Sequence, residues 1–121
     1  MIERLFSGTI FGIEAHIVEV QMSVGNGFPR YSIVGLPDAA VSEARERVLG
    51  ALKATGREIR FRAITVNLAP AHLRKEGSLL DLSLAVGIVN AHSDERVVMD
   101  DVVILGELAL DGAVRTVVGA L

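Results

Sequence analysis

The stretch ITVNLAPAHLRKEGS, residues 64–78, leads from a strand pattern through a charged loop into an apolar helix. Apolar and polar residues alternate over Ile64–Leu68, which predicts a half-buried strand. Pro70 then interrupts the hydrogen-bonding ladder, and Gly77 frees the backbone before the next element. The run that follows is apolar nearly all round, so it predicts a central helix over Leu79–Ala91.

The charged part of this loop is the candidate functional site. A loop fixed between a buried strand and a buried helix is held rigidly, and such loops often carry binding residues. We therefore expect Arg74, Lys75 and Glu76 to form an exposed functional surface, with little effect of the two basic charges on folding. Ser78 and Asp81 fit the capping-box spacing, so we expect them to cap the helix.

Three strands are predicted before this stretch. They cover Arg4–Ile10, Ile13–Val24 and Arg30–Val34. The glycine–asparagine–glycine sequence at 25–27 tolerates positive φ, which predicts a hairpin turn between the second and third strands.

A helix is predicted between Pro37 and Gly56. Proline fits the first turn, the Asp38 carboxylate favours the positive end of the helix dipole, and glycine suits the end. Glu43 and Arg47 are four residues apart and are expected to pair on the solvent face. Helical spacing predicts that the buried face consists of Val41, Ala44, Val48 and Leu52.

The remaining elements complete the fold class. The strand of the opening stretch is predicted over Arg62–Leu68, and a last hairpin joins Val102–Leu110 to Val114–Val117 across Asp111 and Gly112. The order is therefore β-β-β-α-β-α-β-β. It predicts an α+β fold, a two-layer sandwich in which two main helices cover one face of a mixed sheet.

The composition is that of one globular domain. The chain has 121 residues, of which 50% are hydrophobic and 22% charged. It contains no cysteine, and its first residues lack the features of a signal peptide, so we expect a cytoplasmic protein. Asp81 and Glu107 break the longest apolar runs before they reach the length of a membrane span. The apolar residues at 117–121 lead us to expect a fragment of a longer chain.

Five motifs together resemble the amino-terminal domain of the magnesium-chelatase-like ComM/YifB family of AAA+ ATPases, over essentially the whole chain. They are FGIEA at 11–15, IVGLPDAAV at 33–41, EARERV at 43–48, the loop at 66–77 and LGELALDG at 105–112. The resemblance implies a domain like the proteolytic domain of Lon, with a left-handed crossover between its third and fourth strands. It also implies that an ATPase module follows, which is absent from this chain.

The resemblance allows a test for peptidase activity. Lon-like domains can use a serine nucleophile with a lysine base. Matching the family's motifs to this chain puts Leu79 at the serine position and Leu121 at the lysine position. Leucine can neither attack a carbonyl nor accept a proton, so no catalytic residue is expected. Ser78, three residues from Lys75, is better interpreted as a helix cap.

Cofactors are not expected in this chain. It has no Gly-x-x-x-x-Gly-Lys-Ser/Thr motif, so ATP and Mg²⁺ are expected only for the absent ATPase module. His16, His72 and His92 are not at metal-ligand spacing, and we expect no metal site. The expected partners are the chain's own AAA+ module and neighbouring subunits in a hexamer, with DNA as a further candidate and no membrane.

Two functions remain open. In the first, the domain is a non-catalytic part of a DNA-remodelling ATPase, which the ComM resemblance connects with branch migration of DNA during natural transformation. There it would shape the ring or contact DNA phosphates, unless its basic side chains are merely solvated. These side chains are Arg57, Arg60, Arg62, Arg74 and Lys75. In the second, it is a protein-interaction and oligomerisation module, for which an exposed apolar patch would be the sign.

Overall fold

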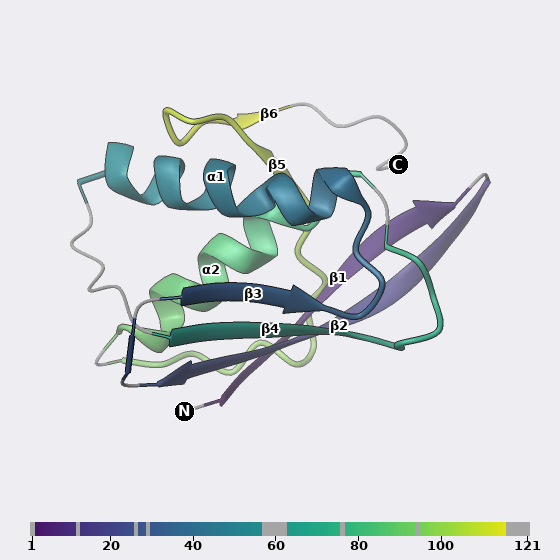
Figure 1. Cartoon of the computed structure of the whole chain (residues 1–121), viewed down its shortest axis with the longest axis horizontal. Helices are drawn as coiled ribbons and strands as arrows, with labels where there is room; N and C mark the ends of the chain where they lie inside the picture. Colours follow the sequence, from purple (N-terminus) through teal and green to yellow (C-terminus); the bar gives the residue numbers. More distant parts are fainter. Residues whose placement is uncertain are drawn as a thin grey trace.

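The computed structural model describes residues 2–11, 13–25, 27–28, 30–56, 63–75, 77–93 and 95–115. Within them, strands and helices follow the predicted order (Figure 1). Their bounds are β1 Ile2–Phe11, β2 Glu14–Gly25, β3 Arg30–Val34, α1 Ala39–Ala54, β4 Ala63–Ala69, α2 Asp81–Ala91, β5 Glu107–Leu108 and β6 Val114–Arg115. The predicted α+β class is confirmed, because α1 and α2 lie on one face of a mixed sheet (Figure 1).

Strand β4 lies between β2 and β3 in the sheet. The strand order is β1-β2-β4-β3, with β2 antiparallel to β1 and β4, and with β3 parallel to β4. The predicted hairpin between the second and third strands is therefore wrong, although Asn26 of its turn lies outside the described residues. Parallel neighbours need a long crossover, and α1 is part of the one between β3 and β4. Both strands consequently end at the same edge of the sheet.

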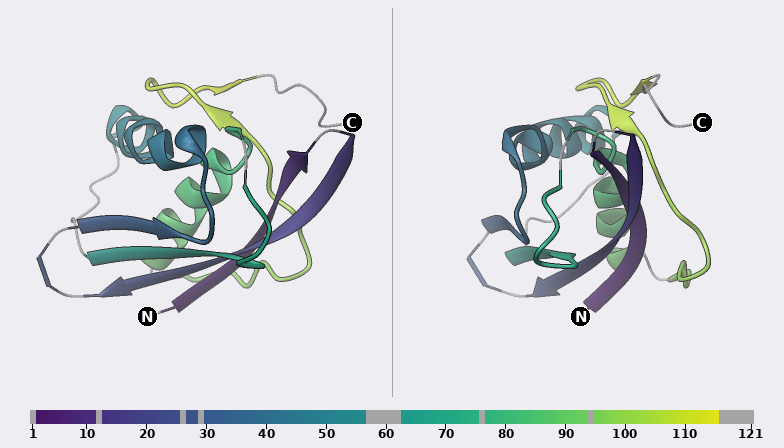
Figure 2. Two further views of the ribbon diagram at one scale, coloured as in Figure 1. Left: turned by 45° about the vertical axis from the view of Figure 1, so that its right-hand side comes forward. Right: turned by 90° about the vertical axis from the view of Figure 1, so that its right-hand side faces the viewer.

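The core lies between the sheet and the two helices. The predicted buried face of α1 is confirmed, and α2 is buried over most of its surface. The sheet contributes alternate residues of β2 and β4, such as Met22 and Val66, which are fully buried. Gly87 of α2 packs against Leu5 and Met22 so closely that a β-carbon there would approach them within 2.9 and 3.1 Å. Figure 2 shows β1 and β2 curving beside α2.

The start of α2 differs from the prediction. The helix begins at Asp81, with Leu80 at the capping position and no side-chain hydrogen bond to the helix end. The predicted cap by Ser78 and Asp81 is therefore wrong. Backbone carbonyls satisfy the first amides instead: Asp81 N–H donates to Ser78 at 3.2 Å, and Leu82 N–H donates to Gly106 at 3.0 Å. Neither helix in the described part of the chain could cross a membrane.

The last predicted hairpin is confirmed, with short strands. β5 and β6 pair antiparallel, Leu108 opposite Val114. The preceding residues from 102 to 105 do not extend this hairpin, because Ile104 N–H donates to the Phe6 carbonyl at 2.9 Å and so lies along β1. The predicted extension of the last strand to Val117 lies outside the described residues.

The turn after β3 passes very close to β4. Gly35 has φ +108°, and a β-carbon on it would lie 2.1 Å from the Leu68 carbonyl oxygen. Only glycine fits such an approach, because a side chain would overlap the neighbouring backbone. Leu36, the next residue, has φ +54°, which is uncommon for a non-glycine residue. The close approach brings this turn onto the segment that follows β4.

We predict that Gly35→Ala lowers the free energy of unfolding by more than about 3 kcal/mol, because it adds a backbone overlap to the strain of positive φ. Gly56→Ala is the matched control, since Gly56 has φ +75° but no atom lies within 4 Å of its β-carbon position. The control should cost only about 1–2 kcal/mol. Denaturant unfolding measures both, and equal losses would contradict the proposed overlap.

Candidate functional site

The candidate site lies where the segments after β3 and β4 meet, at the carboxyl ends of these parallel strands. Lys75 N–H donates to the Leu36 carbonyl at 3.0 Å, and Asp38 N–H donates to the Lys75 carbonyl at 2.9 Å. Pro37 and Lys75 thus form a short parallel bridge. Two sequence motifs that lie about thirty residues apart, 33–41 and 66–77, are therefore in direct contact.

Asp38 connects the two segments through its carboxylate. Its Oδ1 accepts the Val41 N–H at 2.8 Å and so caps α1, at whose start the sequence placed this carboxylate. Its Oδ2 accepts the Gly77 N–H at 3.0 Å. One carboxylate therefore fixes both the start of α1 and the loop before α2. The sequence predicted that Asp38 stabilises the start of the helix through the helix dipole, but it gave no sign of the second contact, which depends on the pairing of β3 with β4.

Lys75 is fully buried, which contradicts the prediction that it faces solvent. Its Nζ donates a hydrogen bond to the Pro70 carbonyl, which belongs to the same loop. Burial lowers the pKa of this amine below its ordinary value, because the charged form loses its hydration. Its backbone pairing with Leu36 and Asp38 holds the residue against the domain, where its side chain is covered. Lys75 is therefore part of the internal structure of the loop.

Arg74 is the predicted loop cation that stays exposed. It is two residues after His72, which is also exposed, and it precedes Lys75, which pairs with Leu36. The Leu36 side chain is 52% exposed. Arg57, Arg60, Arg62 and Glu76, the other predicted members of the surface, lie outside the described residues. The described part of the site therefore exposes the Leu36 side chain on the turn after β3 and the Arg74 guanidinium on the segment after β4, and these two segments are hydrogen-bonded to each other.

A buried ion pair lies behind the site and was missed by the sequence analysis. Arg47 Nε and Nη2 donate to Asp81 Oδ2 and Oδ1 at 2.6 and 3.0 Å, and the Asp81 side chain is fully buried. Arg47 Nη2 also donates to the Ala40 carbonyl at 2.7 Å. The predicted pair with Glu43 is long, at 4.0 Å, so Arg47 points mainly into the domain. Its hydrogen bond to Asp81 raises the pKa of Arg47.

The Asp81 carboxylate has further neighbours. Its Oδ2 accepts the Leu108 N–H at 3.1 Å, which ties β5 to α2. Burial raises the pKa of the Tyr31 phenol, and the negative charge of Asp81 adds to this effect. The spacing of Ser78 and Asp81 fits a capping box, so the sequence analysis assigned Asp81 to the helix cap. The pairing of Asp81 with Arg47 depends on tertiary structure and was therefore not predicted.

His16 and His92 each lie close to an oxygen atom of a neighbouring group. His16 Nε2 lies 3.3 Å from Glu14 Oε2, and His92 Nδ1 lies 2.8 Å from the Ile88 carbonyl oxygen. Within the described residues, no group of three or more histidine, aspartate or glutamate side chains is arranged to hold a metal ion. Leu79 is buried, and Leu121 lies outside the described residues.

The chain is an α+β domain in which the loop after β4 is held by hydrogen bonds to the turn after β3 and by the buried Lys75 side chain. Residues 18–121 match the protein family described as subunit ChlI of Mg-chelatase. The chain belongs to this family, so the predicted magnesium-chelatase-like membership is confirmed.

Similar proteins are much longer than this chain. YifB of Escherichia coli K12, an uncharacterized protein, is 41% identical over 112 residues, covering 91% of this chain and 22% of YifB. The competence protein ComM of Haemophilus influenzae is 37% identical over 118 residues, covering 97% of this chain and 23% of ComM. An uncharacterized protein of Mycobacterium tuberculosis H37Rv is 40% identical, covering 98% of this chain and 24% of that protein. The chain thus spans about a quarter of the length of these relatives.

We predict that Lys75 makes the domain more stable as the pH rises toward 10.5, the ordinary value of a lysine pKa. The folded state has the lower pKa, so the unfolded chain holds more protons in the window below 10.5, and raising the pH favours folding. The slope cannot exceed about 1.4 kcal/mol per pH unit. Lys75→Met keeps a flexible stem without the amine and should remove this rise.

Lys53→Met is the matched control, because Lys53 is an exposed lysine of α1. Its pH dependence of unfolding, measured with denaturant from neutral pH to about pH 10.5, should follow that of the parent chain. A rise that persists unchanged in Lys75→Met would contradict the role of the buried amine.

We also predict that Asp81→Asn lowers the free energy of unfolding by about 3 kcal/mol, because it leaves the Arg47 guanidinium without its buried counter-charge. Asparagine still offers an acceptor to the Leu108 N–H. Adding Arg47→Met should therefore recover part of the loss. A double-mutant cycle by denaturant unfolding measures the coupling, and a coupling below about 0.5 kcal/mol would contradict a strong pair.

Proposed function

We propose that this chain is a non-catalytic domain of a ComM- or YifB-type member of the ChlI family, and that its braced loop shapes the assembly of the full-length protein. In this proposal, the surface around Leu36 and Arg74 contacts the rest of the polypeptide or a neighbouring subunit. The observation that carries the proposal is the bridge between Leu36–Asp38 and Lys75, which holds an exposed apolar side chain at a defined position.

Three features support protein contact at this loop. Leu36 is held at positive φ and exposes 52% of its surface, although polar residues are better suited to such a position. Val34, at the end of β3, is also exposed. Asp38 and Lys75 are engaged inside the domain, so much of the local charge is unavailable to a ligand. An apolar contact rimmed by Arg74 matches the composition of protein interfaces.

Contact with DNA phosphates is the second candidate. Arg74 is exposed, and Arg57, Arg60 and Arg62 add basic residues in the sequence. ComM is named a competence protein, which favours a role near DNA. The burial of Lys75 weakens this candidate, because one of the two adjacent loop cations cannot reach a phosphate. We therefore place protein contact first.

The wider setting is part of the same proposal. The part of the full-length protein that this chain does not cover would contain the AAA+ ATPase module, which binds ATP and Mg²⁺. The full-length protein would assemble as a hexamer in the cytoplasm. It would remodel DNA, while this domain keeps a Lon-like arrangement with a left-handed crossover but no catalytic residues. The chain covers 22–24% of its relatives, which leaves ample length for such a module.

We predict that Leu36→Asn in the full-length protein weakens subunit association by about tenfold or more, while the melting temperature stays equal or rises. Asparagine tolerates positive φ better than leucine but removes the apolar contact. Analytical ultracentrifugation measures association, and calorimetry measures melting. Phe28→Asn is the matched control, because Phe28 is exposed before the start of β3, at the opposite end of that strand.

Arg74→Ala separates the two candidates. If the loop contacts phosphates, this variant alone should weaken DNA binding for all sequences and reduce the salt slope by about one. If Leu36→Asn leaves subunit association unchanged and Arg74→Ala lowers the salt dependence of DNA binding, contact with DNA phosphates becomes the better supported function.

A further inference from the structure

Strand β1 is the outer strand of the sheet and turns part of its backbone toward a free edge. Its pairing with β2 runs without a bulge, so alternate residues point their N–H and C=O groups to the same side. The Phe6 carbonyl accepts Ile104 N–H at 2.9 Å, and the Ile2 carbonyl accepts Arg96 Nη2 at 3.3 Å. Both contacts lie on the outer side. Arg4, between them, therefore presents its own N–H and C=O to that edge.

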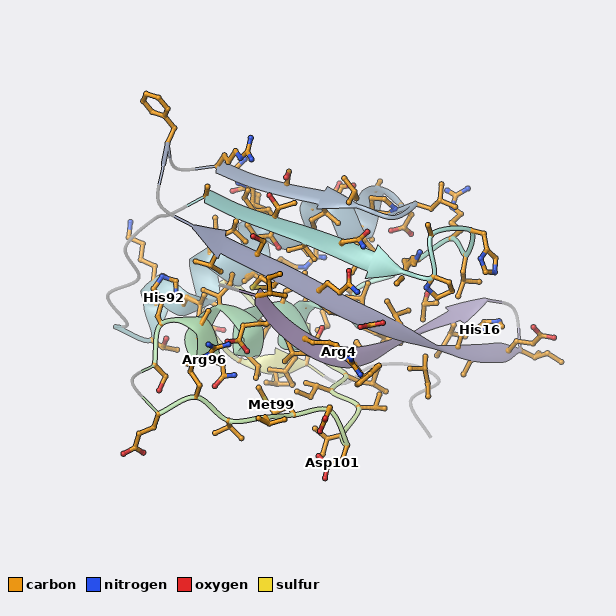
Figure 3. All side chains as sticks on the ribbon, turned by 90° about the horizontal axis from the view of Figure 1, so that it is seen from below. Arg4, His16, His92, Arg96, Met99 and Asp101 are labelled. Carbon is orange, nitrogen blue, oxygen red and sulfur yellow. The ribbon has the colours of Figure 1, made fainter. Side chains whose placement is uncertain are left out.

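The segment from Arg96 to Ile104 bows away from this edge. Four residues of β1 separate its two contact points, Ile2 and Phe6, a rise of about 13 Å. Eight residue steps separate Arg96 from Ile104, and fully extended they would span about twice that length. The slack opens a groove of about 470 Å³, lined by Ile2–Arg4 and Arg96–Asp100. Figure 3 shows Arg4 on the sheet and Arg96, Met99 and Asp101 on the segment beside it.

Half of the residues that line the groove are apolar, and the bowed segment beside it carries two acidic side chains. Ile2, Val97 and Val98 line it and are 72%, 61% and 79% exposed. Asp100 and Asp101 are exposed on the bowed segment and have no ion-pair partner within the part of the chain that the structure describes.

The two arginines near the groove are already neutralised. Arg4 pairs with Glu19 at 3.2 Å, and Arg96 pairs with the buried Glu3 carboxylate. The charge left to attract a ligand is therefore that of Asp100 and Asp101, and it is negative.

We propose that this groove binds an extended segment of a partner protein, apolar on one side and basic on the other, which adds to the edge of β1 as a short strand. The partner's backbone would pair with the N–H and C=O of Arg4, its apolar side chains would contact Ile2, Val97 and Val98, and its basic side chains would face Asp100 and Asp101. Strand addition supplies affinity through the backbone, and alternate side chains supply selectivity. The inference does not depend on the role of the loop at Leu36 and Arg74.

The test uses a capped hexapeptide of alternating lysine and valine as the probe, with binding to this chain measured by calorimetry. The same peptide with glutamate in place of lysine should bind at least about tenfold more weakly. Asp100→Asn with Asp101→Asn should weaken binding of the lysine peptide by about fivefold, and the loss should shrink in high salt. Glu46→Gln, which removes an exposed carboxylate of α1, should leave binding unchanged.

Hydrogen exchange tests strand addition itself. The Arg4 amide should be protected when the lysine peptide is bound, and a peptide with N-methylated valines should lose most of its affinity, because it cannot donate to the edge. Equal binding of the lysine and glutamate peptides, an Arg4 amide that exchanges as fast with peptide as without it, or no binding at millimolar peptide would each overturn the proposal.

Discussion

The arrangement of α1, α2 and the β5–β6 hairpin depends on the interactions of the Asp81 carboxylate. This carboxylate lies in the first turn of α2, where the helix dipole favours a negative charge, and it is fully buried. Arg47 brings α1 to it with two hydrogen bonds, and Leu108 N–H brings β5. A buried charge is tolerated only when its partners are in place, so this carboxylate requires two helices and the final hairpin to keep one relative position.

In the candidate site too, charged side chains hold together segments that are distant in the sequence. Lys75 was predicted to face solvent and Asp38 to start a helix, yet both side chains also hold the loop in place. Arg74 and Leu36 are the exposed side chains of the two paired segments. The domain covers about a quarter of its relatives' length, and our proposal assigns this surface to contacts with other parts of the longer protein. The charges that support the loop, those of Asp38 and Lys75, are therefore distinct from the side chains that the site exposes.

One face of the sheet is covered by helices, whereas the described residues cover the outer edge at β1 only in part. Its covered face forms the core with α1 and α2. Among the residues that the structure describes, the outer edge of β1 is contacted by the segment near residues 96 and 104. Exposed edges are usually blocked, because unpaired backbone groups invite another strand. Here the blocking segment is longer than the edge that it covers, and the opening carries apolar and acidic side chains. The domain therefore has two separated surfaces, one at the ends of β3 and β4 and one at the edge of β1.

The sequence by itself determined the order of the elements, the buried face of α1, the start of that helix at Asp38 and the turn at Asp111 and Gly112. These features are local, because periodicity and capping residues act within a few positions of the chain. Only the tertiary structure decided that β4 separates β2 from β3, that Lys75 is buried, and that Asp81 binds Arg47 instead of capping α2 with Ser78. Each of these outcomes depends on a partner more than thirty residues away. A local pattern shows which side chains are polar, but their environment is set by the distant segments that pack against them.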